Sequence, residues 1–297
     1  MAVGDGFRVS DVRCTGGPAG FDAPEVEHGH LLVAARRGAF LRREGPTEAL
    51  IDGTVAYLSA PGLVEQFAHP NPGGDVCTAI ALDPGLLASL AGGDPVAVPG
   101  VLPMDAASEL AMRRLTAMAR RGDPEGSLAE HVIGFAACLL ARRLPERTGS
   151  GRPATAAARR QVVSRAKAAL AADPRLGLVE LSRVTGCSPH HLSRVFARLT
   201  GLTVSQYRNR LRVSLALERV VGGEPDLAGL ADDLGFADHA HLTRTVRAAT
   251  GRTPSSLRAA FREAGCKTEM QECLMVPGHV PDLSEDALSR AGIARRV

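Results

Sequence analysis

The side chains best suited to a chemical task are arginines, histidines and hydroxyl groups that recur in two stretches, residues 188–198 and 238–247. Arginine can donate two parallel hydrogen bonds to guanine, and histidine, serine and threonine can add single hydrogen bonds in the major groove. The alternative is two solvated helix surfaces with ordinary charges. Because similar side chains occupy matching positions in both stretches, we predict that they contact DNA. The candidates are His190, Ser193, Arg194 and Arg198 in the first stretch, and His239, Ala240, Thr243, Arg244 and Arg247 in the second.

Both stretches lie inside an internal repeat. The first copy covers residues 178–208 and the second covers 227–258, with one extra residue in the second copy between Gly235 and Leu242. Leucine, glycine, threonine, serine and arginine recur at corresponding positions of the two copies. Two copies are too few for a solenoid, so a small helical unit used twice is the better interpretation.

Each copy has the pattern of a helix-turn-helix. Apolar residues at helical spacing predict a short first helix, and Gly186 or Gly235 then allows a sharp turn. Ser188, followed by Pro189, and Asp238 are typical N-caps of a second helix. Two helices joined by such a turn form a DNA-binding motif. The positions expected to be buried are Leu178, Leu181, Val184, Leu192, Val195, Phe196 and Leu199 in the first copy, and Leu227, Leu230, Leu234, Leu242, Val246 and Ala249 in the second.

A long helix is predicted between the two copies. It covers residues 203–221, with Thr203 as its N-cap. At about 1.5 Å per residue its length is roughly 28 Å. Successive major-groove faces on one side of B-DNA lie about 34 Å apart. A single rigid helix could therefore hold the two motifs over adjacent turns of one duplex.

Residues 156–263 resemble the DNA-binding domain of the AraC/XylS family of transcription regulators, most clearly in GFADHAHLTRTVRAATGRTPSSLR, residues 235–258. The resemblance implies seven helices, two helix-turn-helix units and base contacts from the early turns of the second helix of each unit. Two positions depart from the family pattern. Val246 stands where phenylalanine is usual, and Ala240 has no hydrogen-bonding group, which leaves it contact with a thymine methyl. We expect Arg165, Arg208 and Arg258 to contact phosphates.

The charge of the chain is divided unevenly. The net charge of 297 residues is only +3, but residues 156–265 hold 17 basic and 9 acidic side chains, whereas residues 1–155 hold 14 and 18. Positive charge on the repeat is what phosphate binding requires. The N-terminus lacks the pattern of a signal peptide, and the longest apolar stretch, residues 132–141, is too short for a bilayer. Six cysteines without a CxxC pair favour a cytoplasmic protein that does not associate with membranes.

The fold class predicted is α+β. Short apolar runs separated by glycine and proline favour a cupin-like barrel, followed by helices at residues 84–90, 105–121 and 127–144. The last of these helices could pack on the barrel, form a dimer contact, or do both. The expected domains are a sensor or dimerisation domain at 1–144, a polar linker at 145–155, the all-α DNA-binding domain at 156–265 and a tail of unknown role at 266–297.

Two other functions are possible for this sequence. His28 and His30, with His69, Cys77, Glu25 and Glu27, could form the metal site of a cupin-type enzyme, but the glycine and glutamate spacing of that motif is absent. Cys187, in the first turn, could make the protein a regulator triggered by oxidation or metal, although a small buried residue there is commoner. We therefore predict neither enzyme activity nor a metal or other cofactor.

The function predicted is a sequence-specific transcription regulator. Its first domain would sense a signal, such as a small-molecule effector, and could form a homodimer. Its second domain would bind double-stranded operator DNA and act on RNA polymerase. The effector, the dimer and the polymerase contact follow from the family resemblance, not from particular residues.

Overall fold

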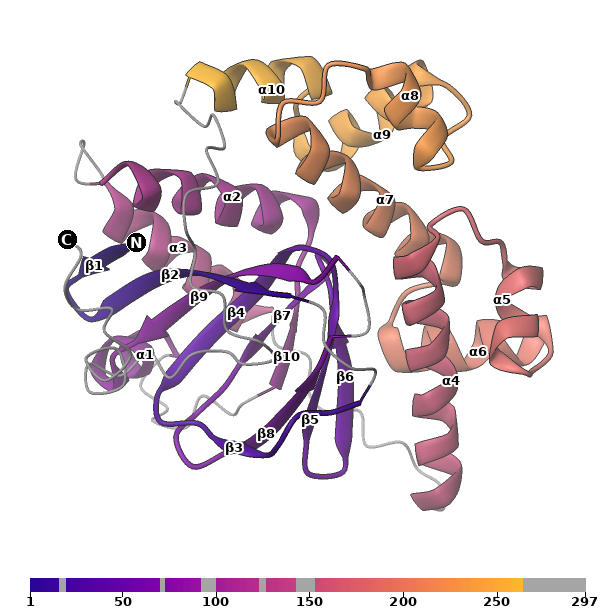
Figure 1. Cartoon of the computed structure of the whole chain (residues 1–297), viewed down its shortest axis with the longest axis horizontal. Coiled ribbons are helices and arrows are strands. Elements are labelled where there is room, and N and C mark those ends of the chain that lie inside the picture. Colours follow the sequence, from indigo (N-terminus) through magenta and orange to yellow (C-terminus); the bar gives the residue numbers. More distant parts are fainter. Residues whose placement is uncertain (16–19, 70–72, 92–99, 123–126, 143–152, 264–297) are drawn as a thin grey trace. The chain divides into compact units, whose positions relative to one another are not determined.

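The computed structural model describes residues 1–15, 20–69, 73–91, 100–122, 127–142 and 153–263 (Figure 1). These residues fall into two compact units, 1–142 and 153–263. The predicted linker and tail lie largely outside the described residues. None of the described helices combines the length and the apolar composition needed to cross a bilayer.

The described strands of the first unit form two antiparallel sheets. The larger sheet has the order β1-β2-β9-β4-β7-β10, and the smaller has the order β3-β8-β5-β6. The strands are β1 (Ala2–Gly4), β2 (Phe7–Cys14), β3 (Glu25–Val26), β4 (His30–Arg37), β5 (Phe40–Glu44), β6 (Thr47–Ile51), β7 (Val55–Leu58), β8 (Val64–Ala68), β9 (Asp75–Leu82) and β10 (Gly100–Pro103).

Both faces of the larger sheet are buried, as β4 shows. Because successive side chains of a strand point to opposite faces, Leu31 and Val33 pack between the two sheets, together with Phe40 and Phe67 of the smaller sheet. Leu32, between them in sequence, belongs to a second core on the other face. The near-continuous burial of residues 31–35 is therefore a consequence of two separate cores on one strand.

Three helices cover the outer face of the larger sheet: α1 (Pro84–Leu90), α2 (Ala106–Arg121) and α3 (Leu128–Ala141). Figure 1 shows α2 and α3 beside that sheet, on the side away from the smaller one. Leu128, Val132 and Leu139 of α3 are buried in the core with the sheet residues. Of the two roles considered for this helix, the structure therefore shows packing on the β-rich region.

The prediction of a closed, cupin-like barrel is not confirmed. Among the described strands, β1 and β10 are the edges of one sheet, and β3 and β6 are the edges of the other. No ladder joins these edges within the described residues, so the architecture is a two-sheet sandwich with a helical layer. The short apolar runs that favoured β structure, at residues 31–33, 39–42, 48–51, 55–58 and 76–82, lie in β4, β5, β6, β7 and β9.

The second unit is helical in its described part. Its helices are α4 (Pro153–Ala172), α5 (Leu178–Thr185), α6 (Pro189–Thr200), α7 (Val204–Val221), α8 (Leu227–Asp233), α9 (His239–Thr250) and α10 (Pro254–Glu263). These seven helices agree with the number that the family resemblance implied. Figure 1 shows α7 running from the group α4–α6 to the group α8–α10. It begins at Thr203, whose hydroxyl accepts a hydrogen bond from the Gln206 amide, as expected of the predicted cap.

Two residues that were predicted to be buried in this unit are exposed. Val184 has 54% of its surface exposed, and Thr185 is buried in its place. A helix turns by about 100° per residue. Val184, six residues after Leu178, therefore points roughly 120° away from it, whereas Thr185, seven residues after Leu178, lies on nearly the same face. Ala249 is exposed because it lies in the last turn of α9, next to the end of the helix.

Candidate DNA-binding surface

The first helix-turn-helix is formed by α5 and α6, and its turn is built from local hydrogen bonds. Gly186 has a φ of 70°, in the left-handed region, and its amide donates to the carbonyls of Ser182 and Arg183. Ser188 follows in an extended conformation, and its Oγ accepts a hydrogen bond from the His191 amide at 3.2 Å. Pro189 occupies the first helical position, where the missing amide proton costs nothing.

The second helix-turn-helix, α8 and α9, repeats this construction. Gly235 also has a φ of 70°, and its amide donates to the Asp232 carbonyl at 2.9 Å. Asp238 caps α9, since its Oδ1 accepts a hydrogen bond from the His241 amide at 2.5 Å. The predicted turns and caps of both copies are therefore confirmed. We refer to α6 and α9 as the reading helices.

One face of each reading helix is buried. Leu192, Val195 and Phe196 of α6 are buried, and the Phe196 ring meets the Tyr207 ring of α7 edge-on, with centroids 5.4 Å apart. In α9 the buried residue Val246 is fully inaccessible. The valine that replaces the usual phenylalanine is thus part of a closed core. These contacts determine which face of each reading helix is exposed to solvent.

The nine candidate side chains lie on that outer face. Ser193 and Thr243 are half-buried, and the other seven are exposed. Within the described residues, neither Arg194 nor Arg244 takes part in an ion pair, so both guanidinium groups keep their donors available. The exposed candidates are His190, Arg194 and Arg198 on α6, and His239, Ala240, Arg244 and Arg247 on α9.

Two of the three arginines expected at phosphates make internal hydrogen bonds. Arg208 Nη1 donates to the Leu176 carbonyl at 3.2 Å, just before α5. Arg258 Nη1 donates to the carbonyls of Glu224 at 2.6 Å and Pro225 at 3.1 Å, just before α8. Both side chains are half-buried, whereas Arg165 is exposed. The first two arginines thus hold the entrance of each helix-turn-helix unit in place.

The thiol of Cys187 lies in the first turn, as the thiol-sensor alternative requires. It is half-buried, and its Sγ is 3.2 Å from the Thr185 Oγ1. This position suits the small apolar residue that the simpler interpretation expected.

The histidines and glutamates proposed for a cupin metal site do not gather. His28 precedes β4 and is exposed, and the Glu27 carboxylate is occupied by the amides of His28 and Gly29. Within the described residues, the only group of three potential ligands whose atoms all approach within 4.8 Å is Cys14, His69 and Asp75. His69 was among the candidates chosen from the sequence but Cys14 and Asp75 were not, because the proximity of Cys14 and Asp75 depends on strand register.

Comparisons with known proteins match the part of the chain that contains the two helix-turn-helix units. Residues 181–260 match the family described as "Helix-turn-helix domain". The regulator RipA of Corynebacterium diphtheriae is 32% identical over 34% of this chain and 29% of its own length. The regulator GlxA of Rhizobium meliloti is 28% identical over 70% and 58%, and the arabinose operon regulatory protein of Escherichia coli is 27% identical over 31% and 32%. The chain therefore spans less than two thirds of each of these relatives.

Solved structures show a weaker likeness. ToxT from Vibrio cholerae O395 is 11% identical over 87% of this chain and 99% of its own, with a TM-score of 0.34. A probable AraC family transcriptional regulator from Rhodopseudomonas palustris is 24% identical over 35% of this chain and 96% of its own, with a TM-score of 0.30. Scores this low do not establish a shared fold, so the assignment rests on the sequence matches and on the repeated geometry. Residues 181–260 therefore match a helix-turn-helix domain, and the relatives that the chain resembles are transcription regulators.

Proposed function

We propose that the protein is a transcription regulator that reads two adjacent major-groove segments of operator DNA with α6 and α9. The observation that carries the proposal is the repetition of one capped, outward-facing reading helix in each unit, with Arg194 and Arg244 at matching places. Arginine at the start of a helix in the major groove can pair with guanine through two hydrogen bonds. A single solvated helix would not require this repetition.

The linking helix supports binding by both units at once. The 18 residues of α7 span about 27 Å at roughly 1.5 Å per residue. This length approaches the spacing of about 34 Å between successive major-groove faces. Since α7 is continuous and buried along much of its length, it can act as a stiff spacer between the reading helices.

The first unit gives the regulator its responsiveness. We assign to it the sensing of a small-molecule effector and the formation of a homodimer, and we place the protein in the cytoplasm, acting on RNA polymerase. An effector that binds one arrangement of the protein more tightly than another would shift the population of DNA-binding states. This part of the proposal has its support in the family resemblance and in the separate, fully formed core of the sandwich.

Fluorescence anisotropy on the full-length chain tests the DNA-binding part. The protein is titrated into DNA from upstream of its own coding region and into a random duplex of equal length, over a series of salt concentrations. We expect tighter binding to the upstream DNA at every salt concentration, because base contacts add to the phosphate term. Equal binding to both duplexes that disappears with added salt would contradict sequence reading, since only the electrostatic contribution would then be present.

A further inference from the structure

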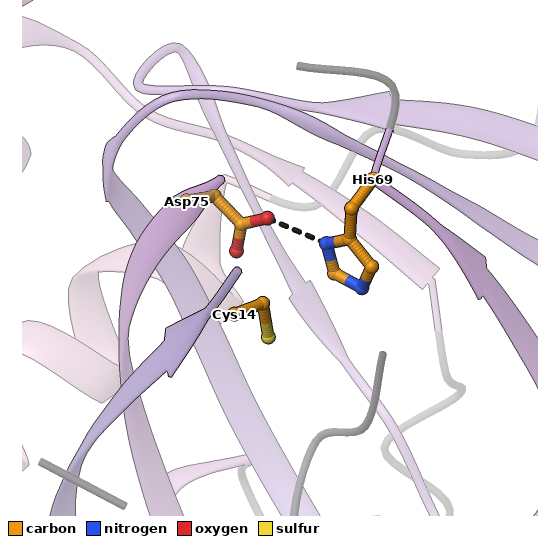
Figure 2. Close-up of side chains that lie close together, drawn as sticks. All are labelled: Cys14, His69 and Asp75. Atoms are coloured by element: carbon orange, nitrogen blue, oxygen red, sulfur yellow. Dashed lines mark hydrogen bonds and ion pairs between the residues drawn. The ribbon is translucent and has the colours of Figure 1, made fainter. Parts of the chain in front are cut away.

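Three buried side chains of different chemistry meet at one end of the first unit. Cys14 is the last residue of β2, Asp75 is the first of β9, and the two are direct partners in the antiparallel ladder. His69 follows β8 of the smaller sheet. Figure 2 shows His69 and Asp75 facing each other, with Cys14 beside them. The cluster therefore joins elements of both sheets.

The contacts within the cluster are short and specific. His69 Nδ1 lies 2.6 Å from Asp75 Oδ2, and the Cys77 thiol donates to Asp75 Oδ1 at 3.4 Å. One ligand atom from each of Cys14, His69 and Asp75 lies within 4.8 Å of the others. The exposed fractions of the three residues are only 2%, 3% and 1%. The carboxylate is thus fixed on both oxygens while it remains shielded from water.

One polar atom of the cluster has no hydrogen-bond partner within the described residues. His69 is the one ion-pair partner of Asp75 within the described residues, and His69 Nε2 is a buried atom without a hydrogen-bond partner there. A buried polar atom without a partner is costly in an interior that excludes water.

We propose that Cys14, His69 and Asp75 bind one divalent cation of the zinc type. A thiolate, an imidazole nitrogen and a carboxylate oxygen are all accepted zinc ligands, and three protein ligands leave one position for water or another molecule. Zinc–ligand distances of about 2.0–2.3 Å place tetrahedral ligand atoms roughly 3.3–3.8 Å apart, so only small side-chain rotations are needed. Binding releases the thiol proton of Cys14.

Cys77 supports this site without being a ligand. The Cys77 thiol is buried and donates to Asp75 Oδ1 at 3.4 Å, so it can hold the carboxylate as a supporting residue holds a ligand. A disulfide between Cys14 and Cys77 is disfavoured by register, because the ladder pairs Cys77 with Val12. Diagonal neighbours in a ladder lie about 7–8 Å apart, beyond the usual Cα separation of a disulfide.

Cobalt and zinc titrations of the full-length chain test the proposal. The chain is reduced, freed of metal with a chelator and titrated with Co²⁺, which reports thiolate ligation through a near-ultraviolet charge-transfer band. We expect one equivalent to produce this band, one equivalent of Zn²⁺ to remove it, and Zn²⁺ to raise the melting temperature. Absence of the band, or a stoichiometry other than one per chain, overturns the proposal whatever any variant does.

Variants then assign the ligands. Cys14→Ser should abolish the band, and His69→Gln should weaken binding even if Cys14→Ser does not fold. Cys77→Ala should keep the band but weaken affinity by about 10–100-fold, as for loss of a supporting residue. Cys138→Ser, a half-buried thiol on α3, is the matched control and should bind as the wild type does. An unchanged titration in a folded Cys14→Ser protein, or two sulfur ligands in the X-ray absorption spectrum of the zinc form, would refute the three-residue site.

Discussion

Arg208 and Arg258 make the same contact in the two copies of the repeat. Each donates from its guanidinium to a backbone carbonyl more than 30 residues earlier, directly before the first helix of its own unit. Thr200 and Thr250 show a second such correspondence, since each hydroxyl bonds to the carbonyl two residues ahead. The repeat thus preserves internal hydrogen bonds as well as the exposed side chains that we propose read DNA.

We predict that Arg208→Ala and Arg258→Ala each lower the free energy of unfolding by about 1–3 kcal/mol. The reason is that a half-buried carbonyl loses a charged donor and remains unsatisfied. Urea unfolding followed by circular dichroism measures the effect. Arg165→Ala, which removes an exposed arginine of the same domain, is the control and should leave the midpoint nearly unchanged. Full stability of both variants, with weaker binding to all DNA, would show that these arginines contact phosphates after all.

The two reading arginines should act on different parts of one binding site. We predict that Arg194→Ala and Arg244→Ala each weaken binding to the preferred DNA by about 1–3 kcal/mol and leave random DNA almost unaffected. Binding to a set of single base-pair substitutions should then show relaxed preference in two segments, one for each variant, about one helical turn apart. Arg114→Ala, an exposed arginine on α2, controls for the loss of one positive charge. Relaxation in the same segment for both variants would contradict the arrangement proposed here.

The sequence predicted the second unit well because its structure depends on local signals. Ser188, Thr203 and Asp238 each bond to an amide three residues ahead, and such caps are recognisable from a few neighbouring residues. Val184 shows the limit of the same reasoning. A spacing of three residues is close to the helical period, but two such steps carry Val184 away from the buried face of the helix.

The first unit was less predictable because its strands are defined by distant partners. In strand β2 the alternation of apolar and polar residues is interrupted at Ser10 and Asp11, which weakens the strand signal of this segment taken without its partner β9. The same dependence explains why Cys14 and Asp75 were not recognised as neighbours: 61 positions separate them in sequence, and only the register of the β2–β9 ladder brings them opposite each other. Sheet closure likewise depends on pairing between edge strands, which a single strand's sequence does not encode.

The two turn glycines should differ in their tolerance of alanine. Both have a φ of 70°, so a Cβ costs roughly 1–2 kcal/mol in each. At Gly186 nothing lies within 4 Å of the added carbon, whereas at Gly235 it would meet the Arg175 side chain at 2.7 Å and the Arg212 guanidinium at 2.8 Å. We therefore expect Gly235→Ala to be the more destabilising change in thermal unfolding.

Gly134 provides a control for these two substitutions. It is a helical glycine of α3 with open space around it, so alanine there causes no backbone strain. Gly134→Ala should stabilise the protein by about 0.5–1 kcal/mol, because alanine is the better helix former. Arg212 also donates from Nε to the Pro174 carbonyl at 2.9 Å, and its displacement by a new methyl group would weaken that bond. Equal losses for Gly186→Ala and Gly235→Ala would mean that both arginine side chains move aside without cost.

His30 should make the first unit sensitive to mild acid. Burial lowers the pKa of its imidazole, and its Nδ1 is buried without a hydrogen-bond partner within the described residues. The unfolded chain, whose histidine keeps the ordinary value near 6.5, therefore binds the proton more readily than the folded chain. The contribution of His30 to stability is fully present above that value and is lost as the pH falls from it through the lower pKa of the folded state.

We expect the melting temperature to decrease over this range, and to decrease less in His30→Gln. His28→Gln, which removes an exposed imidazole two positions away, is the matched control. Parallel profiles for the wild type and His30→Gln would assign the acid sensitivity to other groups.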